Sequence, residues 1–215
     1  MKYYILGILF LFGAAGNAFA QNSDDILNEL SEKAKGFKNI HAKYSSRLID
    51  KANGIDLKQT GEAYVEGEKY YVELGDYIMI TDGETIWTYE KETNDCYVDY
   101  LEDVGDDASM SPSKMFTIWE EDFKHEFKEM SKVNGRDCYL VYLYPNNPAE
   151  NAFHTIQLYV DKAKMEVVKF IVKGREGNDV IYEVTDFNPN TTLPSGVFQF
   201  QESKHPGVNI IDNRL

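Results

Sequence analysis

Residue types that bind metals or carry out catalysis are present in this chain, but their spacing assembles no familiar reactive group. Four histidines lie far apart, without the spacing of zinc ligands: His41, His125, His154 and His205. The adjacent carboxylates at Asp106-Asp107 and Glu120-Glu121-Asp122 are typical of a solvated face. The sequence contains no nucleophile elbow, dinucleotide-binding motif or phosphate loop. We therefore expect no catalytic residue, no metal and no cofactor, and a protein that is not an enzyme.

The residues that stand out are large aromatic and aliphatic side chains gathered in the segment 61–89. They occur in strand-like runs joined by tight turns, one of them at Asp82-Gly83. Such strands either bury their rings as an ordinary core or keep one face apolar for a ligand. The sequence leaves both interpretations open, and the choice between them is the functional question.

One long helix and many strands are expected to position these side chains. The helix begins at a Ser23 cap, carries Asp24 and Asp25 at its positive end and ends at Gly36. Its apolar stripe recurs at helical spacing: Ile26, Leu27, Leu30, Ala34 and Phe37. This stripe needs a large apolar partner, and a sheet is the available one.

From Ile40 onward the apolar period changes to two, which predicts strands. We expect them at 40–48, 57–65, 70–74, 77–81, 85–89, 96–100, 126–130, 138–144, 155–160, 167–172, 180–187 and 197–200. Short, hairpin-like connections favour antiparallel pairing, and if about ten or eleven of these segments join one sheet, that sheet is expected to curl or close. The predicted fold class is α+β: an unclosed antiparallel β-barrel, or half-barrel, with helices covering its concave face.

A second, short helix is predicted after the acidic, glycine-containing loop 101–111. Ser111-Pro112 would open it, and its apolar surface would comprise Met115, Phe116, Ile118 and Trp119. Flexible thioethers such as Met115 suit surfaces that adapt to disordered alkyl chains. The preceding loop could act as a hinge for this helix.

The N-terminal residues 1–20 have the pattern of a signal peptide: Lys2, an apolar stretch, and a small-x-small end at Ala18-Phe19-Ala20. We expect a secreted protein in which residues 21–215 form a single domain. Loss of Lys2 changes the formal charge from −14 to −15, which argues against nucleic acid as a partner. Cys96 and Cys138 either form a disulfide or remain buried free thiols.

The order of several short motifs resembles the periplasmic outer-membrane lipoprotein carrier family, the LolA type. The resemblance covers nearly the whole mature chain. It rests on five segments: Ile40-His41-Ala42-Lys43-Tyr44, Gly61-Glu62-Ala63-Tyr64-Val65, Tyr70-Tyr71, the run that starts at Thr81-Asp82-Gly83, and Val197-Phe198-Gln199-Phe200. The third of these is the family's aromatic pair, and the fourth continues to Ile86-Trp87-Thr88-Tyr89. The last is followed by Pro206-Gly207-Val208 and Ile211-Asp212, similar to the family's tail.

The resemblance implies an unclosed barrel whose concave face holds acyl chains beneath helical lids. It nominates a lipid-binding cavity lined by Tyr64, Tyr71, Met79, Trp87 and Tyr89, and a lid formed by Met115, Phe116, Ile118 and Trp119. The implied partners are acylated lipoproteins, an inner-membrane ABC-type exporter and an outer-membrane acceptor. The implied location is the periplasm.

One departure from the family bears on gating. Many members carry an Arg-Pro pair just after the strand that corresponds to Gly61–Val65, and that arginine is tied to lid closure. This chain has Gly67-Glu68 there, with Lys69 as the nearest cation. A gate in this protein is therefore not held in the same way, and a second hypothesis stays open. It is a periplasmic lipid sensor or protein-interaction module of the same fold that does not transport lipoproteins.

Overall fold

The computed structural model describes residues 22–104, 118–120 and 123–214. The predicted signal peptide and residues 105–117, which include Met115 and Phe116, lie outside these ranges. No helix among the described residues combines the length and the apolar character needed to cross a membrane.

Within these described ranges, twelve strands form one sheet. In chain order they are β1 (Ile40–Asp50), β2 (Ile55–Glu66), β3 (Lys69–Leu74), β4 (Tyr77–Thr81), β5 (Thr85–Glu90), β6 (Asp95–Tyr100), β7 (Phe123–Val133), β8 (Arg136–Pro145), β9 (Phe153–Asp161), β10 (Glu166–Gly174), β11 (Asn178–Pro189) and β12 (Asn209–Asp212). The spatial order is β12-β6-β5-β4-β3-β2-β1-β11-β10-β9-β8-β7. All neighbours pair antiparallel except β12 and β6, which are parallel.

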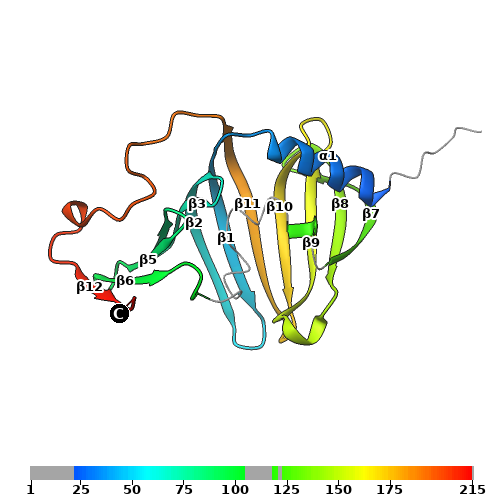
Figure 1. The fold of residues 1–215 in the computed structure, drawn as a ribbon. Helices are drawn as coiled ribbons and strands as arrows, with labels where there is room; N and C mark the ends of the chain where they lie inside the picture. Colours follow the sequence, from blue (N-terminus) through cyan, green and yellow to red (C-terminus); the bar gives the residue numbers. More distant parts are fainter. Residues whose placement is uncertain (1–21, 105–117, 121–122, 215) are drawn as a thin grey trace, which may run out of the picture.

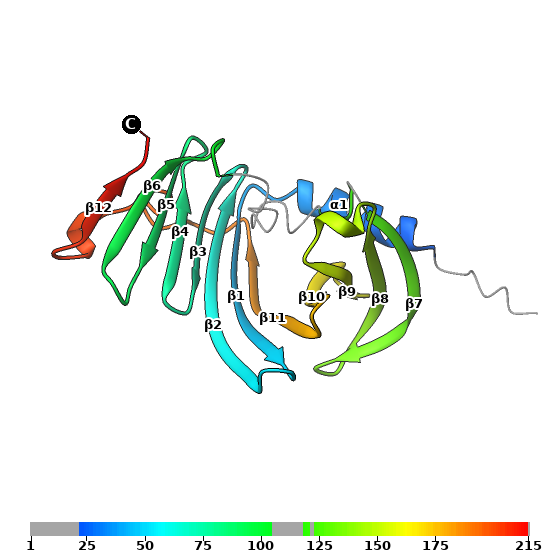
Figure 2. The same ribbon diagram turned by 90° about the horizontal axis from the view of Figure 1, so that it is seen from below.

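The sheet curves without closing. Strands β1 and β2 on one side and β7 and β8 on the other bend toward each other, as in a barrel left open (Figure 2). The two end strands of the sheet, β12 and β7, are not neighbours in the strand order. The predicted unclosed antiparallel barrel is thus confirmed, with twelve strands in place of ten or eleven.

Helix α1 (Ser23–Lys35) lies across one end of strands β7 to β10 (Figure 1). Its N-cap is Asn22, whose side chain accepts a hydrogen bond from the backbone N–H of Asp24, so the predicted Ser23 cap is one residue too late. Gly36 ends the helix as predicted. Three short 3₁₀ turns complete the described elements: η3 (Ile118–Glu120), η4 (Pro148–Glu150) and η5 (Glu202–Lys204).

The predicted strand at 197–200 is wrong. Val197 and Gln199 donate their backbone N–H groups to Pro194 and Gly196, so this segment forms local turns instead of a ladder. The place beside β6 is taken by β12, whose residues pair from Asn209 with Asp95 onward. A short apolar run does not distinguish a strand from a turn whose side chains are buried.

The two cysteines do not form a disulfide. Cys96 and Cys138 are buried free thiols on β6 and β8. Eight strands lie between β6 and β8 in the sheet, so the fold keeps the two sulfur atoms apart. Of the two alternatives open from the sequence, the structure therefore selects free thiols.

Candidate functional site

The sheet has two faces of different character, and cross-strand pairing assigns side chains to them. Residues that pair directly across antiparallel strands project to the same face, and successive residues alternate. We call the face that packs against α1 the inner face and the opposite one the outer face.

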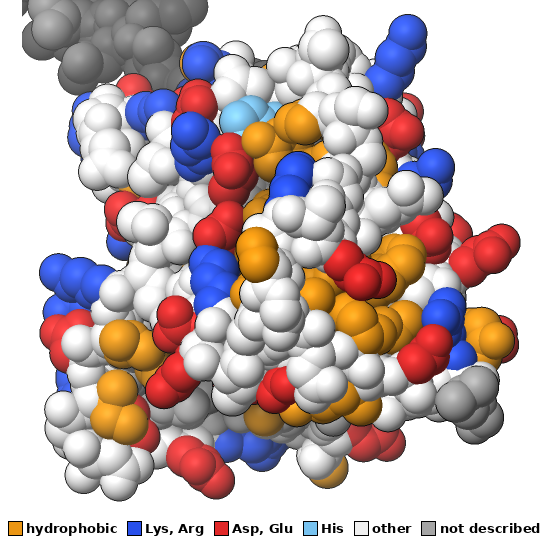
Figure 3. Space-filling model, turned by 90° about the vertical axis from the view of Figure 1, so that its left-hand side faces the viewer, with side chains coloured by type: hydrophobic (Ala, Val, Ile, Leu, Met, Phe, Trp, Pro, Cys, Tyr) orange, Lys and Arg blue, Asp and Glu red, His pale blue; other side chains and the backbone are white. Residues whose placement is uncertain are grey.

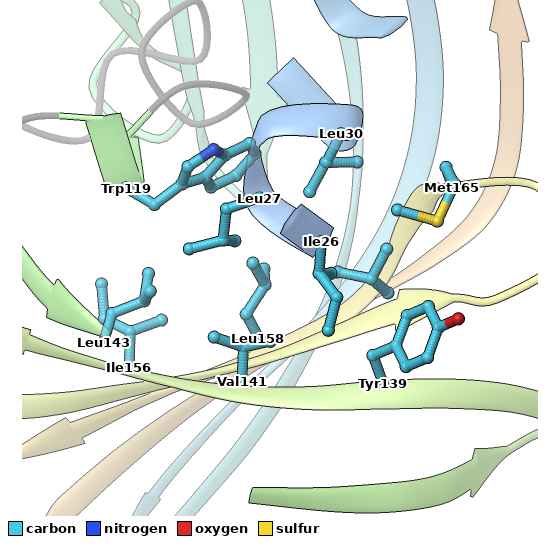
Figure 4. Close-up of a cluster of buried hydrophobic side chains, with 11 residues drawn as sticks. Ile26, Leu27, Leu30, Trp119, Tyr139, Val141, Leu143, Ile156, Leu158 and Met165 are labelled. Carbon is cyan, nitrogen blue, oxygen red and sulfur yellow. The ribbon is translucent and has the colours of Figure 1, made fainter. Parts of the chain in front are cut away.

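Beneath α1, the inner face carries the largest buried cluster among the described residues, the helix cluster (Figure 4). It comprises Ile26, Leu27, Leu30, Trp119, Tyr139, Val141, Leu143, Ile156, Leu158, Val160 and Met165. Three residues of the predicted helical stripe, Ile26, Leu27 and Leu30, thus meet alternate residues of β8 and β9, whereas Phe37 packs edge-on against Phe187. Burial of such side chains contributes about 25 cal/mol per Å² of apolar surface.

Trp119 joins η3 to α1 within this cluster. Its side chain is 4% exposed, and its indole N–H donates a hydrogen bond of 2.8 Å to the Ser31 hydroxyl of α1. At the surface, the Lys35 ammonium lies 2.8 Å from the Glu120 carboxylate, and this pair lowers the pKa of Glu120. One buried and one exposed polar contact therefore hold η3 on α1.

Further polar contacts hold both ends of α1 to the rim of the sheet. At the N-terminal end, the Ser23 hydroxyl lies 3.1 Å from Nδ1 of His125 on β7. Near the C-terminal end, the Lys33 ammonium lies 3.1 Å from the Glu166 carboxylate of β10. The helix is thus anchored by side chains and not by backbone pairing.

A second cluster lies on the inner face of β2 to β5. It consists of buried Val65, Tyr70, Val72 and Ile86 with partly buried Tyr44, Ala63, Met79, Leu101 and Val104. Register supports this assignment, because Ala63, Val72 and Met79 pair successively across β2, β3 and β4. We call it the β3 cluster.

Between the helix cluster and the β3 cluster, the inner face remains apolar but is only partly covered. Tyr182 stacks on Phe170 with ring centroids 4.6 Å apart, and its ring lies 6.2 Å from that of Tyr44. Phe170 contacts the helix cluster and Tyr44 the β3 cluster, so the three rings connect them. We call these rings, with the half-buried Leu48 and Val180, the central strip.

The central strip leads to an exposed apolar end at the β1–β2 hairpin. Leu57, which pairs with Leu48, is 49% exposed, and Ile55 is 43% exposed. Apolar side chains left exposed together mark sites of interaction more often than side chains scattered singly. The inner face thus runs from a buried end under α1 to an open apolar end.

Gly61 is required in this surface because the Tyr44 ring lies on it. A Cβ at position 61 would stand 2.4 Å from Cζ of Tyr44 and 2.5 Å from the backbone oxygen of Glu73. The Tyr44 hydroxyl donates to that same oxygen at 3.0 Å. This close approach gives a physical reason for glycine at the first position of the Gly61-to-Val65 motif.

The outer face of β3 to β6 carries a separate apolar cluster covered by the C-terminal segment. Ile78, Ile80, Tyr89, Cys96 and Val98 are buried there, with Tyr71, Trp87, Phe200 and Val208 packed against them. The Tyr89 ring lies 5.5 Å from Phe200 and 4.3 Å from His205, and burial lowers the pKa of His205. Seen from the β12 side, hydrophobic side chains gather in a patch among acidic and basic ones (Figure 3).

The five residues nominated as a lipid-binding cavity therefore do not share one face. Met79 belongs to the inner face, in the β3 cluster. Tyr71, Trp87 and Tyr89 lie on the outer face, and the Tyr64 ring stands edge-on to Tyr71 at 5.8 Å. The five cannot line a single surface, because residues of opposite parity in a strand point to opposite sides. Whether any of them contacts a lipid stays a prediction.

Of the four nominated lid residues, two can be placed. Ile118 and Trp119 form η3, a single 3₁₀ turn within the region where the sequence predicted a longer helix. Met115 and Phe116 fall outside the described residues. The Gly67-Glu68 turn, where the family has its arginine, is exposed, with Gly67 at a φ of +60°.

Sequence reasoning missed the central strip. Tyr44, Phe170 and Tyr182 were each part of a predicted strand, but nothing in the order of strands placed the three rings together. They meet because β1 pairs with β11 across more than 100 residues of chain. The sequence pattern that could have indicated the central strip is the large residues at alternate positions of 40–48 and 180–184, which mark one apolar face on each strand.

The described part of the inner face offers a surface for apolar binding. Among the described residues, no three His, Cys, Asp or Glu side chains come together as metal ligands would. Its surface consists mainly of aliphatic and aromatic side chains, which contact apolar ligands without directional bonds.

Comparison with known proteins agrees with this reading. The family model of the outer membrane lipoprotein carrier protein LolA matches residues 75–201, more than half of the chain. The chain belongs to the LolA family. LolA family members are carriers of outer-membrane lipoproteins in the periplasm, and the family is one of binding proteins rather than enzymes.

Individual relatives are distant. An outer-membrane lipoprotein carrier protein of Wigglesworthia glossinidia brevipalpis is 22% identical over 98% of this chain and 95% of its own length. An uncharacterized protein of Methanocaldococcus jannaschii is 23% identical over 93% of this chain, which spans 58% of that protein's length. A crystal structure of an uncharacterized conserved protein from Thermus thermophilus has a TM-score of 0.60 at 11% identity. It covers 89% of this chain and 99% of its own, and it shows the shared fold alone.

Proposed function

We propose that this protein is a periplasmic carrier that shields the acyl chains of lipoproteins on its inner face and moves them from the inner to the outer membrane. The observation that carries the proposal is the central strip, an apolar surface joining two buried clusters but itself only half-buried. A surface of this kind is unusual unless it has an apolar occupant. The family's role as lipoprotein carriers supports the same reading.

The energetics explain why such a surface is needed. Exposure of an acyl chain to water costs about 0.8 kcal/mol per CH₂, so an escorted lipoprotein must keep its chains covered. The strip supplies aliphatic and aromatic contact without a covalent step. Its exposed end at Ile55 and Leu57 provides a route along which a chain enters from solvent.

Helix α1 and η3 are the elements that would adjust to the size of the cargo. Besides the helix cluster, side-chain polar contacts such as Lys33 with Glu166 attach α1 to the sheet rim, and a partly exposed pair of this kind is worth under about 1 kcal/mol. In this chain, which has Gly67-Glu68 where many family members have their arginine, the Trp119–Ser31 and Lys35–Glu120 contacts hold η3 on α1.

A matched pair of substitutions tests the binding surface. Val180 faces inward on β11, and its neighbour Ile181 faces outward; both are half-buried. We expect Val180→Glu to weaken binding of a pyrene-labelled dodecanoyl chain at least about tenfold, because it puts a carboxylate into an apolar contact. Ile181→Glu is expected to leave the fluorescence titration unchanged.

A third variant, Tyr71→Glu, tests whether the acyl chain binds on the outer face instead. If Tyr71→Glu abolishes binding and Val180→Glu does not, the acyl chain occupies the outer face and the inner-face assignment is wrong. Circular dichroism of each variant checks that the fold is retained.

Transport itself requires a cellular readout. On depletion of the protein, we expect newly made lipoproteins labelled with an alkyne fatty acid to accumulate in the inner-membrane fraction. The Val180→Glu variant should fail to restore their transfer. If the purified protein binds the acyl probe but lipoprotein transfer is normal without it, the protein is a lipid-sensing or interaction module of this fold and not a carrier.

A further inference from the structure

Beside Tyr182 of the central strip, a second polar side chain, Ser46, lies directly opposite in the sheet. Ser46 of β1 pairs with Tyr182 of β11, so both project to the inner face. Residues paired across successive strands form a row on this face. Beyond Tyr182, the row contains Phe170, Leu158 and Val141, all apolar. On the far side of Ser46 it continues with Gln59, whose amide lies against Gly75.

Neither hydroxyl is used by the fold in the part of the chain that the structure describes. The Tyr44 hydroxyl, one row away, donates to the Glu73 carbonyl oxygen, whereas the Ser46 and Tyr182 hydroxyls have no hydrogen-bond partner there. Asn39 Oδ1 is the one fully buried side-chain polar atom without a partner among the described residues, so neither hydroxyl is completely shut off, although Ser46 as a whole is only 7% exposed. Burial raises the pKa of Tyr182, which keeps its hydroxyl protonated as a donor.

The rows on either side of these hydroxyls are uncharged. One contains Leu57, Leu48, Val180 and Val172, and the other contains Gly61, Tyr44 and Val184. An ionised carboxylate or phosphate placed here would meet no cation of these described rows, and an isolated buried charge is strongly disfavoured. A neutral carbonyl oxygen, in contrast, can accept hydrogen bonds from the two hydroxyls.

We propose that Ser46 and Tyr182 bind the carbonyl group of an ester- or amide-linked acyl chain, and that this pair makes the site selective for such chains over free fatty acids. This inference rests on the proposed function, because it assumes that the inner face binds acyl chains. The hydrocarbon would lie along the central strip, on the Phe170 ring and toward Leu48 and Val180. The polar linkage would lie between β1 and β11.

The selectivity has a definite pH dependence. A free acid must either leave its carboxylate in water or bind as the neutral acid, so its affinity falls as the pH rises above its own pKa. The ester has no proton to lose, so its affinity does not change in that range. The ratio of the two affinities therefore grows from about pH 5 to pH 8.

The test uses the full mature chain and two probes, pyrenedodecanoic acid and its methyl ester, below their aggregation concentrations. At pH 8 we expect the ester to bind at least about tenfold more tightly than the acid. Tyr182→Phe and Ser46→Ala should each weaken ester binding about three- to tenfold, the effect of one net hydrogen bond. Tyr182→Phe retains the ring that stacks on Phe170, which favours a folded variant.

Matched controls lie on the outer face. Ser45 is the neighbour of Ser46 and faces the other way, and Tyr159 of β9 is an outer-face tyrosine that pairs with Lys169. Ser45→Ala and Tyr159→Phe should leave both affinities unchanged. With a ¹³C-labelled ester carbonyl, the infrared stretch should move to lower frequency on binding, and Tyr182→Phe should reverse part of that shift.

The outcomes separate this inference from the proposed function. Equal affinities for acid and ester at pH 8, or an ester titration and carbonyl stretch insensitive to Tyr182→Phe and Ser46→Ala, would overturn the carbonyl site while leaving acyl binding intact. Binding of neither probe would overturn the proposed function and this inference with it.

Discussion

The sharpest structural prediction concerns Gly61, because its reason for being glycine is visible in two distances. Alanine at this position would place a methyl group 2.4 Å from Cζ of Tyr44 and 2.5 Å from the Glu73 backbone oxygen. Contacts that short must be relieved. The Tyr44 ring can rotate away, but the backbone of β3 cannot move without disturbing its ladder with β2.

The expected cost follows from these contacts. Overpacking in a well-packed region costs about 1–3 kcal/mol. Displacement of Tyr44 also loses its hydrogen bond to Glu73, worth about 1 kcal/mol net. Alanine recovers about 0.5–1 kcal/mol by restricting the unfolded chain. We therefore expect Gly61→Ala to lower the free energy of unfolding by about 1–3.5 kcal/mol.

Urea unfolding followed by circular dichroism measures this change. With a slope of about 2 kcal/mol per molar urea, the midpoint should fall by roughly 0.5–2 M. A double-mutant cycle with Tyr44→Ala separates the two contacts, since it removes the clash with the ring and leaves the clash with the Glu73 oxygen. Part of the Gly61→Ala penalty should then disappear. An unfolding midpoint within error of the parent protein would refute the reasoning about close approach.

Three further predictions concern α1 and the thiols. Trp119→Phe should lower the free energy of unfolding by about 1 kcal/mol, since it removes the donor to the buried Ser31 hydroxyl. Trp87→Phe on the outer face serves as the control, and both variants are measured by thermal unfolding. Equal losses of stability in the two variants would argue against the hydrogen bond. Cys96 and Cys138 should react with a thiol reagent only after unfolding, and a reducing agent should not change the melting temperature, whereas rapid labelling of the native protein would contradict their burial. Burial raises the pKa of Cys96 to about 11, so above pH 9 the thiol of the unfolded chain loses its proton while the native one keeps it. The free energy of unfolding should therefore fall between about pH 9 and pH 11. Cys96→Ala should make this fall with pH less steep.

Local pattern determined much of the fold of this protein. The helical stripe at Ile26, Leu27 and Leu30 and the period-two alternation from Ile40 onward predicted one helix on a large antiparallel sheet, because each period allows only one side to be buried. The scattered histidines and carboxylates likewise argued against a reactive centre. These inferences depend on neighbours within a few residues along the chain, which the sequence displays directly.

Tertiary structure decided which side chains share a surface. Tyr71 and Met79 lie in adjacent strands, yet they point to opposite faces, because the register of β3 and β4 pairs Met79 with Val72 and Tyr71 with Ile80. The central strip arises only where β11 returns to pair with β1, and the C-terminal strand pairs in parallel with β6 although no local pattern requires it. Side-chain facing changes with a shift of one residue in register, and register between distant strands is set by the packing of the whole sheet.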